Sequence, residues 1–244
     1  MFALTTAFVA AFLASNAAAH GGVNRYIIDG ELYEGWAPFS GGADQETIGR
    51  PYSSYNPIMD AADATIHCND DGSASANQLT ATVAAGAEIT AQWDQWTHRE
   101  GPVMVYMADC GGDCSAVDSS TLEWFKIDEA GLLSGTVGDG EWGNGVVVDT
   151  LEWTSTIPES LAPGNYLIRH ELLALHQSNT PQFYPECAQL EVTGSGSAKP
   201  SGDALVSFPG GYSMSDPGVT IDIYDSATAA ETTYQAPGPA VWSG

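Results

Sequence analysis

Short runs of alternating apolar and polar residues, separated by turn-forming residues, dominate the chain. The segment VNRYIIDGELYEG (23–35) predicts a strand, a turn at Asp29-Gly30 and a second strand. The segment LTATVAAGAEITAQW (79–93) alternates twice around a glycine turn and predicts two more strands. Further strands are expected in GPVMVYMADC, LEWFKIDEAGLL, LEWTSTI, GNYLIRHELLAL, CAQLEVTG and GVTIDIYD. Roughly eight or nine strands without a long helical period predict an all-β antiparallel sandwich of the immunoglobulin or fibronectin kind.

Two long segments, 36–66 and 131–148, show no regular pattern and are expected to be irregular loops. Loops of this length in a compact domain are usually binding surfaces. The segment GSGSAKPSGD (194–203) resembles a linker, but the strand pattern resumes only briefly after it. We therefore expect a surface loop inside one domain that covers residues 20–244.

The first nineteen residues carry no charge and have a short apolar core. They end in Ala17-Ala18-Ala19, which fits the small-residue rule for signal peptidase, although the usual basic residue near the start is missing. The apolar run is too short to span a membrane comfortably. The pattern predicts a cleaved signal peptide at 1–19 and a secreted, extracellular protein without a membrane anchor, whose mature chain begins at His20.

Charge narrows the choice of partners. Six basic residues stand against 31 acidic residues, for a formal net charge of −25. Such a balance argues against nucleic acid and against an anionic membrane surface as partners. The acidic residues are scattered along the chain, and a neutral substrate suits such a surface.

The chain has four cysteines, and an even number in a secreted protein suggests two disulfides. Cys110 and Cys114 can close a small local loop, and Cys68 and Cys187 would then bridge distant parts of the chain. A thiolate site for a soft metal is the competing interpretation. An oxidising compartment disfavours that alternative.

Histidine is the residue type that points to chemistry here, and its five positions are His20, His67, His98, His170 and His176. Cleavage before His20 would give that residue a free α-amine, so its amine and its Nδ1 could chelate one metal ion. An α-amine has a pKa of about 8 and loses its proton readily to a strong Lewis acid. One more imidazole would complete a T-shaped set of three nitrogens, which favours Cu(II) over zinc.

His98 is the candidate for that second imidazole. It lies in QWTHREGPVMVYM, where a loop leads into the strand that begins at Gly101-Pro102. A loop histidine at the start of a strand can reach the end of the sandwich near the N-terminus, although an exposed loop histidine is the alternative. His170 is interpreted as structural, and His67 as structural or exposed.

A second informative stretch is RHELLALHQSNTPQFYPEC. Gln182 and Tyr184 alternate around Phe183, so they share one face of a strand. Tyr184 could occupy an axial position at the metal, while Gln182 and His176 could donate hydrogen bonds to an oxygen species beside it. The alternative is that Gln182 and Tyr184 are ordinary residues at the edge of the core.

Taken together, these segments resemble the fungal cellulose-active lytic polysaccharide monooxygenases of auxiliary activity family nine, formerly glycoside hydrolase family 61. The resemblance runs nearly from end to end. It starts with the leader before His20-Gly21 and continues with the His98-x-x-Gly101-Pro102-Val103 segment. Many members have a single residue between the second histidine and the Gly-Pro pair, whereas Arg99 and Glu100 intervene here. The other matching segments are CGGDCSAVDSSTLEWFKIDEAGL, IPESLAPGNYLIRHELLALH, QFYPEC, FPGGYSMSDPGVTIDIY and APGPAVWSG.

The resemblance implies a role for each candidate residue. His20 and His98 would form a copper-binding histidine brace, with one copper ion per chain and Tyr184 as its axial residue. His176 and Gln182 would be the outer hydrogen-bonding pair. The family's disulfides fall on Cys68–Cys187 and Cys110–Cys114.

The same resemblance implies the activity and the partners. O2 or H2O2 would be the co-substrate, and electrons would come from a small reductant or a secreted redox partner such as a dehydrogenase. A monomeric enzyme would cleave the β-1,4-glucan chains of cellulose by hydroxylating C1, C4 or both. A copper-binding or carbohydrate-binding sandwich without oxidative activity is the alternative.

Aromatic residues in the loops are the candidates for contact with the apolar faces of sugar rings. The resemblance places Tyr212 on a flat substrate face around the copper, and an outward-facing Tyr212 would favour the enzyme over a copper-binding protein without oxidative activity. The early loop is expected to contribute to the same face through Trp36, Phe39, Tyr52 and Tyr55. The aromatic residues expected in the core are Tyr106, Trp124 and Trp153.

Removal of the leader gives the first testable prediction. Protein that retains even one residue before His20 is expected to lose tight copper binding, because an amide nitrogen then replaces the amine. Isothermal titration calorimetry of the cleaved and uncleaved forms measures the difference. Equal affinities would contradict the assignment of His20.

Overall fold

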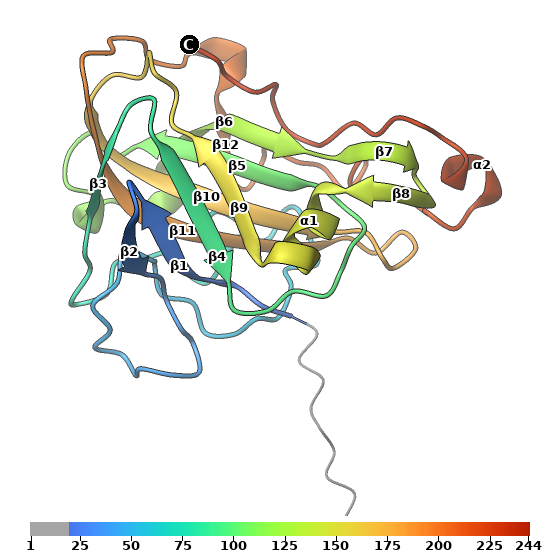
Figure 1. Ribbon diagram of the computed structural model, residues 1–244, viewed down its shortest axis with the longest axis horizontal. Coiled ribbons are helices and arrows are strands. Elements are labelled where there is room, and N and C mark those ends of the chain that lie inside the picture. The colour runs from blue at the N-terminus through green and yellow to red at the C-terminus, as the bar shows by residue number, and fades with distance from the viewer. Residues whose placement is uncertain (1–19) are drawn as a thin grey trace, which may run out of the picture.

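The computed structural model describes residues 20–244, so the predicted leader at 1–19 lies outside the described residues. Two β-sheets lie one above the other and form a sandwich (Figure 1). The four-stranded sheet has the order β2 (Glu31–Glu34), β1 (Val23–Ile28), β4 (Glu88–Trp93) and β9 (Glu152–Thr156). The six-stranded sheet has the order β12 (Val206–Ser207), β6 (Glu123–Ala130), β5 (Val103–Asp109), β10 (Gly164–Ala174), β11 (Gln182–Thr193) and β3 (Ala81–Ala84).

Smaller elements complete the chain. β7 (Leu132–Thr136) and β8 (Asp139–Trp142) form a separate hairpin, and α1 (Gly143–Thr150) and α2 (Ser226–Ala229) are short helices. Three 3₁₀ turns lie at Cys114–Ala116, Ser119–Thr121 and Gly202–Ala204. Within the described part of the chain, no helix has the length and apolar character needed to cross a membrane.

The predicted antiparallel β-sandwich is confirmed. Every strand pair of the two sheets is antiparallel except β11 with β3, which run parallel. The predicted turn between β1 and β2 is also confirmed, because Asp29 and Gly30 both have positive φ angles, as a tight hairpin of this kind requires.

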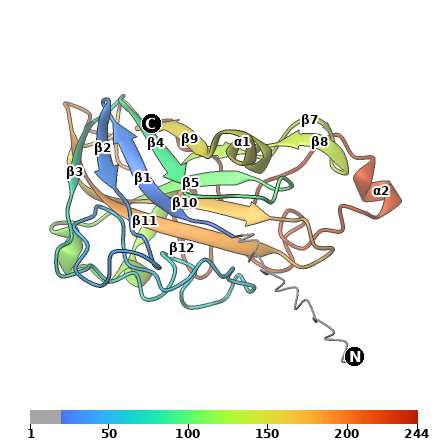
Figure 2. The ribbon, with the colours of Figure 1, turned by 60° about the horizontal axis from the view of Figure 1, so that its bottom comes forward.

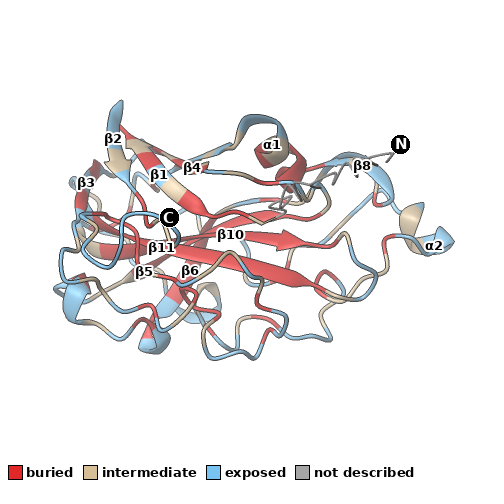
Figure 3. Ribbon diagram, turned by 90° about the horizontal axis from the view of Figure 1, so that it is seen from below, coloured by how far each residue is buried: buried red, intermediate tan, exposed pale blue. Residues whose placement is uncertain are grey.

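The inner strands of the six-stranded sheet are buried on both faces (Figure 3). β5 is accordingly almost continuously apolar, whereas the equally buried β10 also carries Arg169, His170 and Glu171. Along β5, Val103, Val105 and Met107 belong to the core between the sheets. The alternate residues Met104 and Tyr106 belong to a second core on the outer face, which segments 58–68 and 208–223 cover.

Two sequence-based expectations about elements are wrong. Segment 131–148 is not irregular, because it contains β7, β8 and most of α1. Segment GVTIDIYD (218–225) is not a strand. Local hydrogen bonds fold it into turns instead, since Thr220 N donates to Asp216 O and Tyr224 N donates to the Asp222 side chain. Such side-chain bonds compete with strand pairing.

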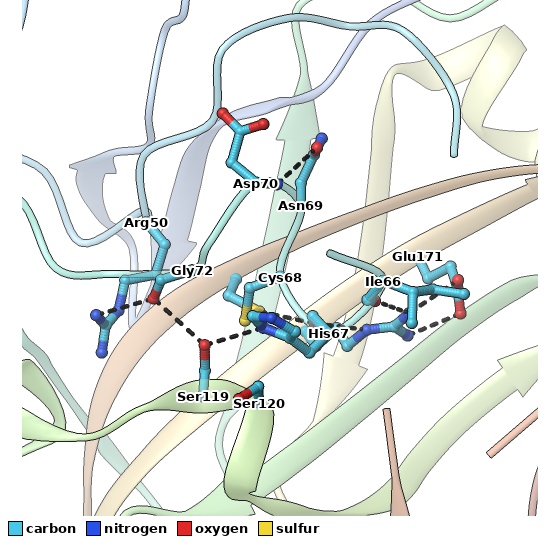
Figure 4. Close-up of a disulfide and its surroundings, with 12 residues drawn as sticks. Arg50, Ile66, His67, Cys68, Asn69, Asp70, Gly72, Ser119, Ser120 and Glu171 are labelled. Carbon is cyan, nitrogen blue, oxygen red and sulfur yellow. Dashed lines mark hydrogen bonds and ion pairs between the residues drawn. A yellow bond between two sulfur atoms is a disulfide. The ribbon is translucent and has the colours of Figure 1, made fainter. Parts of the chain in front are cut away.

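Both predicted disulfides are present, Cys68–Cys187 and Cys110–Cys114, and none of the described cysteines is free. This finding removes the thiolate metal site as an alternative. Figure 4 shows that the chain around Cys68 is held by a buried polar network. Arg169 forms a bidentate ion pair with Glu171 and also donates to the carbonyls of Ile66 and His67. His67 is buried and its Nδ1 lies 3.0 Å from Ser119 Oγ, which agrees with a structural role.

His170 lies fully buried between the sheets, where its ring contacts Tyr26 and Trp93, as expected for a structural histidine. Neither of its ring nitrogens has a hydrogen-bond partner among the described residues. Burial therefore disfavours the charged form and lowers the pKa of His170 to about 3.

An acid-dependent loss of stability follows from this burial. The unfolded chain binds a proton at His170 near pH 6.5, whereas the folded chain keeps the ring neutral down to about pH 3. The contribution of His170 to folding is thus complete above about pH 6.5 and falls as the pH drops toward 3, by about 1.4 kcal/mol for each pH unit. Urea unfolding of the wild type and of His170→Leu across this range is expected to show a shallower pH slope in the variant. Parallel slopes would contradict this account.

Candidate metal centre

Close packing holds the segment that carries His20. Gln95, in the loop after β4, donates its side-chain amide to the His20 carbonyl. A side chain at Gly21 would collide with the Gln95 carbonyl, so only glycine fits beside His20. Gly22 then exchanges hydrogen bonds with Asp94, at 3.3 Å to its side chain and 3.2 Å from its backbone. The residues after His20 are therefore fixed against the end of β4 before β1 begins.

His98 lies on the loop between β4 and β5, and this loop is fastened to the end of β10. Leu175 N donates to Glu100 O at 2.9 Å. Gly101 has a φ of +130° and packs against the Leu173 carbonyl, which leaves no room for a side chain. Arg99, one of the two residues before Gly101-Pro102, forms a bidentate ion pair with Asp149 of α1 at 2.7 and 2.9 Å. The longer spacing after His98 is thus accommodated by contacts with β10 and α1.

The structure brings the predicted site residues together. In the ribbon, β1 and β4 of one sheet lie across β10 and β11 of the other (Figures 1 and 2). The rings of His98 and His176 stack, with centroids 3.9 Å apart and planes 2° from parallel. The centroid of the His20 ring lies 5.4 Å from the ring centroid of His98 and 5.6 Å from that of Tyr184. Trp96 contacts both His98 and Tyr184 edge-on and donates its indole N–H to the His98 carbonyl.

Tyr184 and Gln182 lie on the same face of β11, as predicted from their spacing. Both side chains are buried, and the Tyr184 hydroxyl donates to Gln182 Oε1 at 2.8 Å. Because Oε1 accepts this bond, the NH₂ group of Gln182 is the end of the amide that can donate elsewhere.

The electrostatic environment keeps the imidazoles neutral. Burial, and then the neighbouring His176 and His20, lower the pKa of His98 to about 4. Burial also lowers the pKa values of His20 and His176. The pKa of the Tyr184 hydroxyl is raised by burial and then by the charge of Glu186, so Tyr184 stays a neutral phenol. Neutral imidazole is the form that binds a metal.

The chemistry of these residues fits a copper ion held by a histidine brace. Residues 20–244 contain no group of three or more His, Cys, Asp or Glu side chains placed to hold a metal. The site instead offers two imidazoles whose separation suits bonds of about 2 Å to one ion, with the α-amine of a mature His20 as a third nitrogen. His98 Nε2 and His176 Nδ1 are buried without a hydrogen-bond partner among the described residues. A neutral all-nitrogen donor set is one that Cu(II) favours.

The predictions for three substrate-facing aromatic residues are wrong. Tyr212 is only 5% exposed, because its hydroxyl donates to Glu171 and also contacts the hydroxyl of Tyr106. Tyr52 and Trp36 are 3% and 8% exposed. They bond to each other's backbone, since Trp36 Nε1 donates to Tyr52 O and the Tyr52 hydroxyl donates to Trp36 O. A ring that stacks on a sugar needs a free face, and none of the three has one.

Other aromatic residues occupy the surface instead. Phe39 is 71% exposed and contacts Tyr55 edge-on, and the Tyr55 hydroxyl donates to Asp94 at 2.6 Å. Tyr224 is 66% exposed, and its hydroxyl donates to the His176 carbonyl at 2.7 Å. Tyr224 was not among the predicted surface aromatic residues, because GVTIDIYD was expected to form a strand. The helix-capping pair Asp225-Ser226 that follows was the available signal of a turn.

The core assignments are largely confirmed. Tyr106 and Trp124 are fully buried, whereas Trp153 is partly buried at the edge of the core between the sheets.

Comparison with known proteins identifies the family. The model of auxiliary activity family 9, formerly GH61, matches residues 20–234. AA9 family lytic polysaccharide monooxygenase B of Heterobasidion irregulare is 57% identical over 233 residues, which cover 95% of this chain and 95% of the relative. The AA9 family lytic polysaccharide monooxygenase-like protein CEL1 of Agaricus bisporus is 52% identical over 232 residues, which cover 94% of this chain and 72% of the relative.

Solved structures agree with the family match. The crystal structure of HiLPMO9B superposes with a TM-score of 0.88 and 56% identity, over 92% of this chain and all of that chain. The crystal structure of a cellulose-active polysaccharide monooxygenase from M. thermophila superposes with a TM-score of 0.83 and 43% identity. The match covers 92% of this chain and all of that chain. The fold and the comparisons therefore define a polysaccharide monooxygenase, an oxidoreductase. The chain belongs to auxiliary activity family 9, as the sequence resemblance predicted.

The bond between Tyr184 and Gln182 gives a prediction about stability. Gln182→Leu leaves the buried Tyr184 hydroxyl without an acceptor and is expected to cost about 1–3 kcal/mol of unfolding free energy. Tyr184→Phe is the reciprocal change. Because each single variant strands the other partner, the double variant is expected to cost less than the two single variants together. Denaturant unfolding of the three variants measures this coupling, and additive effects would argue against the bond.

Proposed function

We propose that the chain is secreted, that its leader is removed after Ala19, and that the mature protein is a copper-dependent enzyme. It oxidises the β-1,4-glucan chains of cellulose at C1, C4 or both. O2 or H2O2 is the co-substrate, and a small reductant or a secreted dehydrogenase supplies electrons. The observation that carries this proposal is the convergence of His20, His98 and Tyr184 in a chain of family 9.

His20 and His98 would hold the copper ion. Burial lowers the pKa values of both rings, so protons compete less with the metal for their nitrogens. Cleavage after Ala19 would add the α-amine of His20 as the third nitrogen. When bound, copper supplies the activation of the oxygen co-substrate that hydroxylation of a glycosidic carbon needs.

The surrounding side chains would shield the metal site from water and orient the ring of His98. Tyr184 is a buried, neutral phenol, and its ring would exclude water from the side of the metal that it covers. His176 stacks on His98 and fixes the orientation of that ring. Its unpartnered Nδ1, together with the NH₂ group of Gln182, can hold a co-substrate by hydrogen bonds.

Substrate contact would come from aromatic residues on both sides of the histidines. Tyr224 is bonded to His176, whereas Tyr55 and Phe39 are linked through Asp94 to Gly22, two residues after His20. Exposed rings next to the candidate metal centre favour an enzyme over a copper-capture protein. Tyr212 was expected to distinguish these two classes of protein, but it is buried, so the exposed rings now make the distinction.

The test uses copper-loaded mature protein with cellulose and ascorbate, and mass spectrometry of the products. Aldonic acids or C4-ketones are expected, and their absence with copper confirmed bound would refute the proposal.

Tyr224→Ala is expected to weaken cellulose binding about threefold to tenfold through loss of ring stacking, whereas Tyr224→Phe keeps the ring and most of the binding. Equal binding by the Ala and Phe variants would remove Tyr224 from the substrate face.

A further inference from the structure

We propose that the face around the candidate metal centre selects uncharged glucan and rejects polysaccharides whose rings carry carboxylate groups, by electrostatic repulsion. This inference rests on the proposed function and specifies the class of substrate. Two features carry it: no cationic side chain is left free on the surface, and carboxylates are fixed beside the residues that would meet the substrate.

All six basic residues of the sequence lie in the described part of the chain, and none is free. Arg50, Lys126 and Arg169 are buried. The other three are exposed, and each lies beside a carboxylate: Arg25–Glu34 at 3.8 Å, Arg99–Asp149 at 2.7 Å and Lys199–Asp109 at 2.8 Å. Each exposed cation is therefore already partly neutralised by a neighbouring carboxylate, which weakens its attraction for an arriving uronate.

Carboxylates are held next to the histidine cluster from three directions. Asp94 is fixed by the Tyr55 hydroxyl at 2.6 Å and by Gly22 N at 3.3 Å. Asp222 accepts from the backbone N–H of Tyr224 at 3.0 Å. Its bond from Ser178, and then this one, lower its pKa, so it stays ionised.

The third carboxylate, Glu100, lies two residues after His98, and its backbone carbonyl accepts a hydrogen bond at 2.9 Å from the N–H of Leu175, the residue before His176. These three carboxylates belong to a protein of formal net charge −25, so a bound divalent copper ion leaves the overall field negative.

Neutral sugar rings are not affected by this field, because they bind through stacking on exposed aromatic rings such as Tyr224 and Phe39. A carboxylate at C6 of a glucose unit would be brought close to Asp94, Glu100 or Asp222. Repulsion between exposed charges extends over about 30 Å at 0.01 M salt but only about 3 Å at 1 M. Charge-based rejection is therefore distinguished from steric rejection by its dependence on salt.

The experiment compares three matched fibres: cellulose, the same cellulose with part of its C6 groups oxidised to carboxylates, and the methyl ester of that oxidised material. Binding and product release by the copper-loaded mature protein are measured at about 0.01 M and about 1 M salt. Binding to the carboxylate fibre is expected to be at least about fivefold weaker than to the ester at low salt, and equal at high salt. Equal binding at low salt, or a gap that persists at high salt, would overturn the inference.

Charge variants locate the effect. The double variant Glu100→Gln/Asp222→Asn is expected to narrow the low-salt gap between the carboxylate and ester fibres. Glu88→Gln/Glu159→Gln removes two exposed charges near the opposite end of β4 and is expected to leave the gap unchanged. Equal narrowing by both double variants would overturn a role for this face. Absence of oxidised products from neutral cellulose at both salt concentrations would instead refute the proposed function, since the binding comparison does not depend on turnover.

Discussion

The antiparallel pairing of β10 with β11 is the interaction on which the other features depend. It runs from Gly164 opposite Val192 to Ala174 opposite Gln182, and it joins two inner strands of the six-stranded sheet. One end of this ladder places Gln182 and Tyr184 beside the segment that leads to His176. Its middle is fastened by the Cys68–Cys187 disulfide and by the buried ion pair of Arg169 with Glu171. The loop that carries His98 bonds to the end of this ladder, whereas the segment that carries His20 is held by Gln95 and Asp94 after β4.

The sequence predicted the strands well where alternation and burial agree. The β1–β2 hairpin and strands β5 and β10 were foreseen because their apolar periods match a half-buried or fully buried sheet. The β7–β8 hairpin and α1 were missed, since short elements rich in glycine carry little periodicity. Segment 218–225 shows the opposite error. It alternates like a strand, yet Asp216 and Asp222 satisfy its backbone locally, and tertiary packing supplies no neighbouring strand.

The candidate site divides in the same way. His20, His98, His176, Gln182 and Tyr184 were foreseen because their chemistry and the family resemblance both single them out, and the structure brings them together. The exposed aromatic residues were foreseen only in part, because exposure depends on what covers a ring and not on its type. Phe39 of the early loop is exposed, whereas Trp36 and Tyr52 of the same loop are buried. Tyr212 and Tyr224 lie twelve positions apart in the same C-terminal segment, yet a buried carboxylate, Glu171, draws one hydroxyl inward while the other ring stays outside.

The hydrogen bond from the Tyr224 hydroxyl to the His176 carbonyl joins a surface ring to a backbone whose side chain stacks on His98. Under the proposed function, fibre contact at Tyr224 and metal binding at His98 would therefore both act on one short stretch of chain. Thermodynamic linkage makes such an effect mutual: to the degree that a bound metal steadies the histidine stack and its backbone, the fibre is held more tightly, and a bound fibre strengthens metal retention by the same factor. An enzyme that has left its fibre would accordingly be the form that releases its metal more easily.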